Sequence, residues 1–134
     1  MKIITSIVED FLEDQHIRLK NGCERYLEVM ELFQDYLNYH TYQLFDDEEM
    51  LNLDQKFIEG KKEFCDTFGP YELDPVYFEE FMDYYLIRIV VASESLIKAS
   101  GFVLKKFVKW LFKHSYITEE DFQESFEIIT SLKA

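Results

Sequence analysis

Apolar side chains recur at three- and four-residue steps along almost the whole chain, and this spacing constrains the fold more than any other feature. Such steps stack side chains on one face of an α-helix, whereas a half-buried strand needs strict alternation. The chain has 134 residues with only four Gly and two Pro, too few for the many tight turns of a β-sandwich or barrel. We therefore expect an all-α protein.

Helix boundaries can be read from a few residues with strong local preferences. Asn21-Gly22 ends the first helix, because both residues tolerate a left-handed backbone. The segment FGPYELDP at 68–75 precedes the fourth helix, with Asp74 as its N-cap and Pro75 at its first position. A chain of this length is most simply one domain over residues 1–134, so we predict an irregular bundle of five to six helices. The expected helices span about 5–20, 23–45, 46–68, 75–91, 93–114 and 118–132.

Wide apolar stripes on these helices indicate the core. In the fifth helix we expect Phe107, Trp110 and Leu111 to be buried. Their expected neighbours are the fourth helix together with Phe33 and Leu37 of the second. The stripes are Ile7, Val8, Phe11, Leu12 and Ile17 in the first helix, and Tyr26, Leu27, Met30, Phe33, Leu37 and Leu44 in the second.

The chain resembles itself weakly at a spacing of 70 to 74 residues. FLEDQHIR at 11–18 is similar to FMDYYLIR at 81–88, and FQDYLNYH at 33–40 is similar to FVKWLFKH at 107–114. A duplication would give two pseudo-repeated helical hairpins. Chance similarity is the alternative, because the chain contains 13 Phe and 9 Tyr. Both explanations remain open from the sequence.

The charge distribution separates one segment from the rest of the chain. The formal net charge is −13, yet residues 93–114 carry five lysines against the single acid Glu94, a local net charge of +4. At about 100° per residue, Lys98, Lys105 and Lys109 fall within about 40° of one another. We predict that this helix presents a partner-binding surface. Its residues are Lys98, Phe102, Lys105, Lys106, Lys109 and Lys113.

The sequence leaves two uses of these lysines open. They can bind an acidic protein partner or an oligomer mate, or they can pair with acids of the same chain, from Asp46–Glu49 or from the last helix. A basic stripe beside an aromatic residue also suits a phosphate backbone. The acidic net charge nevertheless disfavours nucleic acid, because it repels a polyanion.

No motif in the sequence predicts catalysis, a cofactor or a bound metal. Glu13 and His16 form one E-x-x-H, but di-iron helical bundles use two, and none precedes His40 or His114. No serine lies in a G-x-S-x-G context, and the isolated glycines form no phosphate-binding loop. We therefore expect a protein that is not an enzyme and has no catalytic, cofactor-binding or metal-binding residues.

Cysteine spacing and hydropathy favour a cytoplasmic protein. Cys23 and Cys65 lie 42 positions apart and form no C-x-x-C, so free, buried thiols are expected, with a disulfide as the alternative. No apolar run approaches the roughly 18 residues that a membrane helix requires. The first residues reach an acid at Glu9 without the long apolar stretch of a signal peptide.

One stretch resembles a known helical family. From Phe78 to Ile117 an aromatic-led helix is followed by a break at Ser93 and a long helix with the pattern K-x-F-x-x-W-L. This pattern resembles the helical core-binding, or SAM-like, domain of tyrosine recombinases and phage integrases. In that family basic helices grip the DNA backbone, and a separate domain supplies the catalytic tyrosine. The resemblance implies that Lys105, Lys106 and Lys109 would contact the backbone.

The function that these observations favour is a non-catalytic helical interaction module. Its basic helix, 93–114, would be presented to an acidic protein partner or an oligomer mate. One alternative is a nucleic-acid-binding accessory protein related to recombinase core-binding domains. Another is a small helical enzyme whose site the sequence does not reveal.

Overall fold

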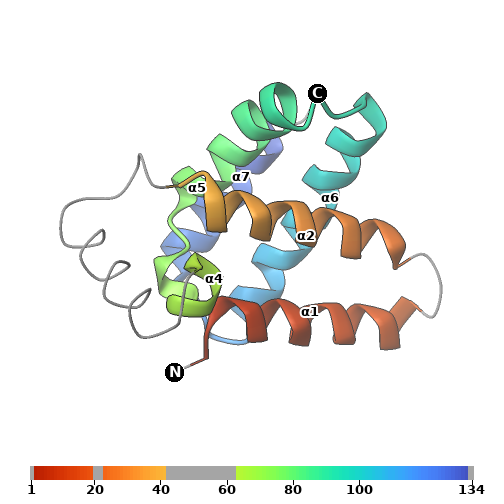
Figure 1. Cartoon of the computed structure of the whole chain (residues 1–134). Coiled ribbons are helices and arrows are strands. Elements are labelled where there is room, and N and C mark those ends of the chain that lie inside the picture. The colour runs from red at the N-terminus through yellow and green to blue at the C-terminus, as the bar shows by residue number, and fades with distance from the viewer. Residues whose placement is uncertain (1, 20–22, 42–62, 133–134) are drawn as a thin grey trace.

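The structure, a computed structural model, describes residues 2–19, 23–41 and 63–132. Every regular element in these ranges is a helical one, which confirms the all-α prediction (Figure 1). The predicted helix 46–68 lies mostly outside the described residues. The elements are α1 (Ile4–Leu19), α2 (Glu24–Tyr39), α4 (Phe64–Thr67), the 3₁₀ turn η2 (Pro70–Glu72), α5 (Pro75–Glu80), the π-helical segment η3 (Phe81–Ile89), α6 (Glu94–Lys113) and α7 (Glu119–Ser131).

Side-chain caps fix three of the helix starts. The Asp74 carboxylate accepts a hydrogen bond from the Val76 amide at 2.9 Å, at the start of α5. At the start of α6, the Ser93 hydroxyl accepts a hydrogen bond from the Leu96 amide at 3.1 Å. At the start of α7, the Thr118 hydroxyl accepts one from the Asp121 amide at 3.1 Å. Each bond satisfies a backbone donor that has no partner within its helix. The starts predicted at these residues are therefore confirmed.

The fourth predicted helix differs from the expectation in its second half. Only α5 is α-helical, and the chain then widens into the π-helix η3. The widened turn ends with a bond from the Val90 amide to the Tyr85 carbonyl, five residues back, at 3.0 Å. Val91 follows with a φ of 54°, which a β-branched residue rarely adopts. A π-helix keeps the apolar face of an α-helix over short stretches, so the sequence pattern could not distinguish the two.

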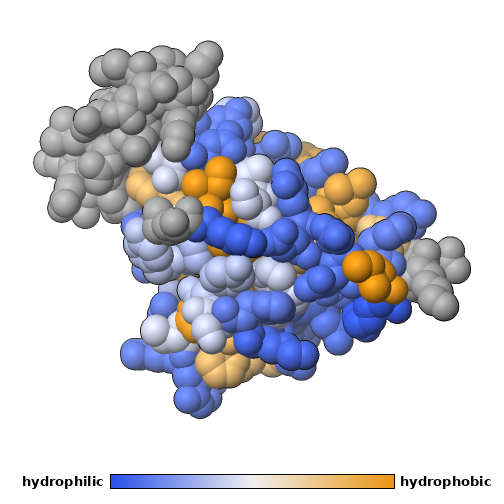
Figure 2. Space-filling model, turned by 90° about the horizontal axis from the view of Figure 1, so that it is seen from below, coloured by the Kyte–Doolittle hydropathy of each residue, from blue (hydrophilic) through white to orange (hydrophobic). Residues whose placement is uncertain are grey.

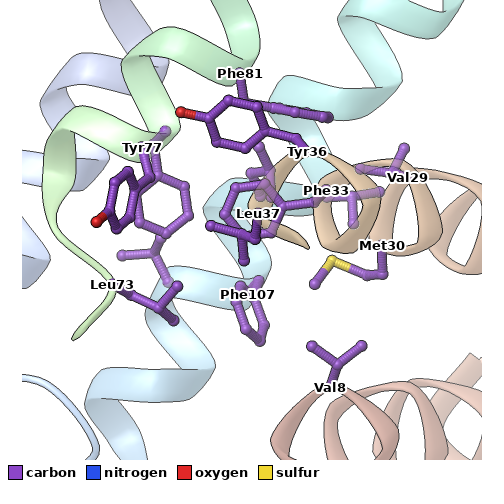
Figure 3. Close-up of a cluster of buried hydrophobic side chains, with 14 of the residues drawn as sticks. Val8, Val29, Met30, Phe33, Tyr36, Leu37, Leu73, Tyr77, Phe81 and Phe107 are labelled. Atoms are coloured by element: carbon purple, nitrogen blue, oxygen red, sulfur yellow. The ribbon is translucent and has the colours of Figure 1, made fainter. Parts of the chain in front are cut away.

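The core is an aromatic cluster around Phe33 of α2 (Figure 3). Its ring lies 5.1 Å from Phe78 and 5.2 Å from Phe81, measured between centroids. Phe107 of α6 reaches the same ring at 6.4 Å. Aromatic pairs at these separations add about 0.5–1.5 kcal/mol beyond the burial of their surfaces. The predicted burial of Phe107 and Leu111 is confirmed, since neither side chain is exposed.

Two residues predicted to face the core are exposed instead. Ile17 of α1 is 67% exposed and Leu27 of α2 is 49% exposed. Ile17 follows the buried Phe11 by six residues, and Leu27 precedes the buried Phe33 by six. Six residues turn a helix by about 600°, which places a side chain about 120° away from the core-facing direction. In addition, α2 ends at Tyr39 rather than at Phe45, and Leu44 lies outside the described residues.

Trp110 is buried against a different helix from the one expected. Its indole ring lies 5.7 Å from Phe11, and its Nε1 donates a hydrogen bond to Asp14 Oδ2 at 2.8 Å. Both partners belong to α1 rather than to the fourth predicted helix. This position agrees with the 100° step between Trp110 and Leu111, which points the two side chains to different neighbours.

The two self-similar halves make equivalent, crossed contacts. Phe11 of α1 meets Phe107 of α6 at 5.0 Å, and Phe81 of η3 meets Phe33 of α2 at 5.2 Å. The first segment of each half, α1 or η3, thus contacts the second segment of the other half, α6 or α2. The two second segments, α2 and α6, pack against each other between them. These paired ring contacts are equivalent in the two halves, and duplication stays a prediction.

Candidate interaction surface on α6 and α7

Three lysines of α6 lie beside aromatic rings on the side of the helix next to α7. The Lys109 ammonium lies 5.4 Å from the centroid of Phe126 on α7, and that of Lys105 lies 5.8 Å from the same ring. The Lys106 ammonium lies 5.5 Å from Phe102, one turn earlier on α6. These five residues line a shallow hollow of about 170 Å³. We call this group the lysine cradle.

The position of α7 explains why the ring of Phe126 lies beside these lysines. Ile129 and Ser125 are buried and fix the inner face of the helix. Phe122 stacks on Phe112 of α6 at 4.9 Å, with only 6° between the ring planes. Phe126 lies one turn after Phe122 and is half-buried. Its ring therefore stays accessible to the lysines of α6 and to a ligand.

In the described part of the chain, acids leave the charges of two cradle lysines, Lys106 and Lys109, unpaired. Within it, no carboxylate lies within 4.0 Å of the ammonium of Lys106, Lys109 or Lys113. Lys98 does pair with Glu94, at 3.2 Å, but both side chains are exposed. Exposed pairs of this kind contribute about 0–1 kcal/mol. Cation–π contacts leave the positive charge in place and hold it near the ring.

The sequence identified most of this surface. Phe102, Lys105, Lys106 and Lys109 lie together, while Lys98 is one turn before Phe102 and Lys113 is at the exposed C-terminal end of α6. The residue that the sequence analysis missed is Phe126. Phe122 and Phe126 are four residues apart, so the sequence places them on one face of the last helix, but it does not say that this face lies beside α6. The acids of Asp46–Glu49 lie outside the described residues.

A second hollow, which the sequence did not predict, lies between α2 and η3. It encloses about 280 Å³. The Tyr36 hydroxyl donates a hydrogen bond to Glu80 at 2.8 Å, and the ring of His40 lies 4.9 Å from Tyr85. Burial, and after it the neighbouring Glu80, raises the pKa of Tyr36 above its ordinary value. The lining consists of Tyr36, Tyr39, His40, Glu80, Tyr84, Tyr85 and Ile89.

A third hollow of about 320 Å³ occupies the related position between α1 and α6. Here Trp110 bonds to Asp14, and His114 Nε2 lies 4.0 Å from the same carboxylate oxygen. Glu13 of the E-x-x-H lines this hollow, and His16 of that motif is exposed outside it. In the described ranges no three His, Cys, Asp or Glu side chains are grouped as metal ligands would be. Cys23 and Cys65 are free thiols, and Cys65 is the buried one.

Comparison of the chain with protein-family profiles, with curated proteins and with solved structures finds no match. The resemblance of residues 78–117 to recombinase core-binding domains therefore stays a prediction. Among the described helices, none combines the length and the hydropathy needed to cross a bilayer. One face of the molecule, seen in Figure 2, is largely hydrophilic, with hydrophobic residues scattered across it.

Proposed function

We propose that this chain is a non-catalytic interaction module whose lysine cradle binds an acidic segment of a protein partner. The observation that carries this proposal is the hollow formed by three ammonium groups and two aromatic rings on α6 and α7. Carboxylates would pair with the lysines, and apolar side chains between them would contact the rings of Phe102 and Phe126. Such mixed recognition is typical of protein interfaces, where aromatic residues supply contact area and charges supply specificity.

The charge pattern supports an acidic peptide over a nucleic acid. The basic surface is confined to one helix of a chain with net charge −13. A nucleic acid presents a phosphate at every nucleotide and would extend beyond the cradle toward the first turn of α7, which carries Glu119, Glu120 and Asp121. A short acidic segment can place its charges on the lysines alone.

The test measures binding of a fluorescein-labelled peptide of alternating Glu and Leu by fluorescence anisotropy. We expect Lys109→Glu to weaken binding about fivefold, since one exposed pair contributes up to about 1 kcal/mol. Lys106→Glu/Lys109→Glu should weaken it further. Phe126→Leu keeps the apolar volume but removes the ring, and should also reduce affinity. Arg88→Glu makes the same charge change on exposed η3 and should leave binding unchanged.

Two results would overturn the proposal. One is equal loss of binding in Arg88→Glu and Lys109→Glu, which would mean that only overall charge matters. The other is tighter binding of single-stranded DNA than of the peptide at about 0.15 M salt, with the steep salt dependence of phosphate contacts. That second result would support the nucleic-acid alternative.

A further inference from the structure

The hollow of about 320 Å³ between α1 and α6 has an aromatic wall. Trp110, in the last turn of α6, lines it together with His114 and Tyr116, which follow that helix. The ring of Trp110 lies 4.4 Å from that of His114 and 5.8 Å from that of Tyr116, measured between centroids. The ring planes of His114 and Tyr116 differ by only 20°. The three rings therefore form one aromatic surface, and we call this site the α1–α6 hollow.

Charged side chains near the N-terminus form the rest of the lining. They are Lys2, Asp10, Glu13 and Asp14. Lys2 Nζ bonds to Asp10 Oδ2 at 2.6 Å, so these two charges offset each other. With a neutral imidazole, a lining of three acids and one lysine has a net charge of −2. The hollow therefore favours a cation.

Glu13 and Asp14 keep oxygens that can accept hydrogen bonds from a ligand. Among the described residues, Glu13 forms no ion pair. Asp14 accepts the Trp110 indole N–H at 2.8 Å and lies 4.0 Å from His114 Nε2, but both contacts use Oδ2 and leave Oδ1 available. Both acidic side chains are exposed, so a ligand in solution can reach them.

A guanidinium group matches both parts of this lining. It is planar and stacks on aromatic rings, and its N–H donors lie in the same plane, where they bond to carboxylate oxygens. A primary ammonium has the charge and the donors but no flat face, and a quaternary ammonium has no donors. Rings combined with acceptor oxygens therefore select a guanidinium among organic cations.

We propose that the α1–α6 hollow is a binding site for a guanidinium group, carried by an arginine side chain of a protein or by a small guanidinium compound. The group stacks on the rings and bonds to Glu13 and to Asp14. The inference goes beyond the proposed function, because the hollow contains no residue of the lysine cradle. The contacts are exposed to solvent, so the dissociation constant for a single group is roughly millimolar.

Trp110 reports on the hollow directly, because it is the single tryptophan of the chain. The experiment titrates the protein with N-acetylarginine amide at about pH 8, where histidine is largely neutral, and at constant ionic strength. We expect a saturable change in the fluorescence of Trp110 and in its indole N–H resonance. N-acetylcitrulline amide has nearly the same shape without the charge and should give no saturable change. N-acetyllysine amide has the charge without the flat face and should bind about fivefold more weakly.

Two pairs of variants locate the site, each with a matched control. Glu13→Gln should weaken binding of N-acetylarginine amide about fivefold, and Glu9→Gln, four residues earlier on α1 and outside the hollow, should leave it unchanged. His114→Asn removes one of the rings and should also weaken binding, whereas His16→Asn should not. All four side chains are exposed, so the fold should tolerate each change, and circular dichroism checks this.

Three results would overturn the inference. The first is the absence of a saturable change with N-acetylarginine amide. The second is equal affinity for this compound and for the citrulline or the lysine compound, which would mean that the hollow does not select a charged, planar group. The third is equal weakening in Glu13→Gln and Glu9→Gln, which would mean that only overall charge matters. Agmatine distinguishes the two sources: tighter binding of agmatine supports a small guanidinium compound, and tighter binding of N-acetylarginine amide supports an arginine side chain.

Discussion

At the scale of single residues, Trp110 links two helices that are far apart in the sequence, α6 and α1. The residue is 9% exposed and its Nε1 donates a hydrogen bond to Asp14, 96 residues away. We expect Trp110→Ala to lower the free energy of unfolding by about 3–5 kcal/mol, and Trp110→Phe by less, because phenylalanine keeps part of the packing but loses the hydrogen bond. Urea titrations measure both values.

The matched control for this prediction is a double-mutant cycle with Asp14→Ala. Once Trp110→Phe has removed the donor, removal of the acceptor should cost less than it does in wild type. Additive effects would mean that the hydrogen bond makes no contribution. The native emission of this single tryptophan should also lie to the blue of its emission in urea.

Tyr36 makes the stability of the fold sensitive to alkaline pH. Burial and Glu80 raise the pKa of its hydroxyl, so the folded chain keeps this proton above pH 10, where the unfolded chain loses it. Stability from Tyr36 is therefore complete below about pH 10 and falls as pH rises from there, by about 1.4 kcal/mol per pH unit. Urea unfolding at pH 8 and about pH 11 should show a smaller fall for Tyr36→Phe.

Tyr71→Phe, at an exposed position, is the control and should not change this pH dependence. Some fall should remain in Tyr36→Phe, because burial also raises the pKa of Tyr85 and of Cys65. If Tyr36→Phe and wild type lose stability equally between the two pH values, the Tyr36 prediction is wrong.

At the scale of elements, the end of η3 stores backbone strain. Val91 has a φ of 54° and a side chain exposed to solvent. A β-branched residue in this left-handed region costs about 1–2 kcal/mol, which glycine does not incur. Val91→Gly should therefore raise the melting temperature, against the usual effect of a glycine substitution.

Val90→Gly is the matched control for Val91→Gly. Val90 has a φ of −79°, where glycine gives no relief, adds freedom to the unfolded chain and removes a partly buried side chain that packs on the core. It should lower the melting temperature. If both variants are destabilised to the same extent, the left-handed turn at Val91 is not a source of strain.

The sequence predicted the positions of the helices better than it predicted which helices pack together. Helical periodicity located Phe33 and Phe107 in the core, and local chemistry located the cap at Asp74. Periodicity alone does not say which helix packs on which, so Trp110 was assigned to the wrong partner. The π-helix and the ring of Phe126 in the cradle both depend on tertiary packing, which no local pattern records.

At the scale of the whole molecule, the excess of acids should make stability depend on salt. Outside residues 93–114 the chain has 26 acids against nine lysines and arginines. Their mutual repulsion opposes the compact state, and screening reduces it. Raising sodium chloride from about 0.01 to about 0.15 M should therefore raise the melting temperature. Potassium chloride at the same concentrations is the control for specific ion effects, and a falling melting temperature would mean that attractive pairs dominate.

The crossed contacts also set an order of events during synthesis on the ribosome. Phe11 is made early, yet two of its ring partners, Phe107 and Trp110, belong to α6. Translation at about 5–20 residues per second separates Asp14 from Trp110 by about 5–20 s. Throughout that interval Phe11 has its contact with Tyr26 of α2 but lacks the two rings that α6 supplies. The part of the Phe11 ring that α6 covers therefore stays exposed until α6 emerges, and a chaperone could bind there during that interval.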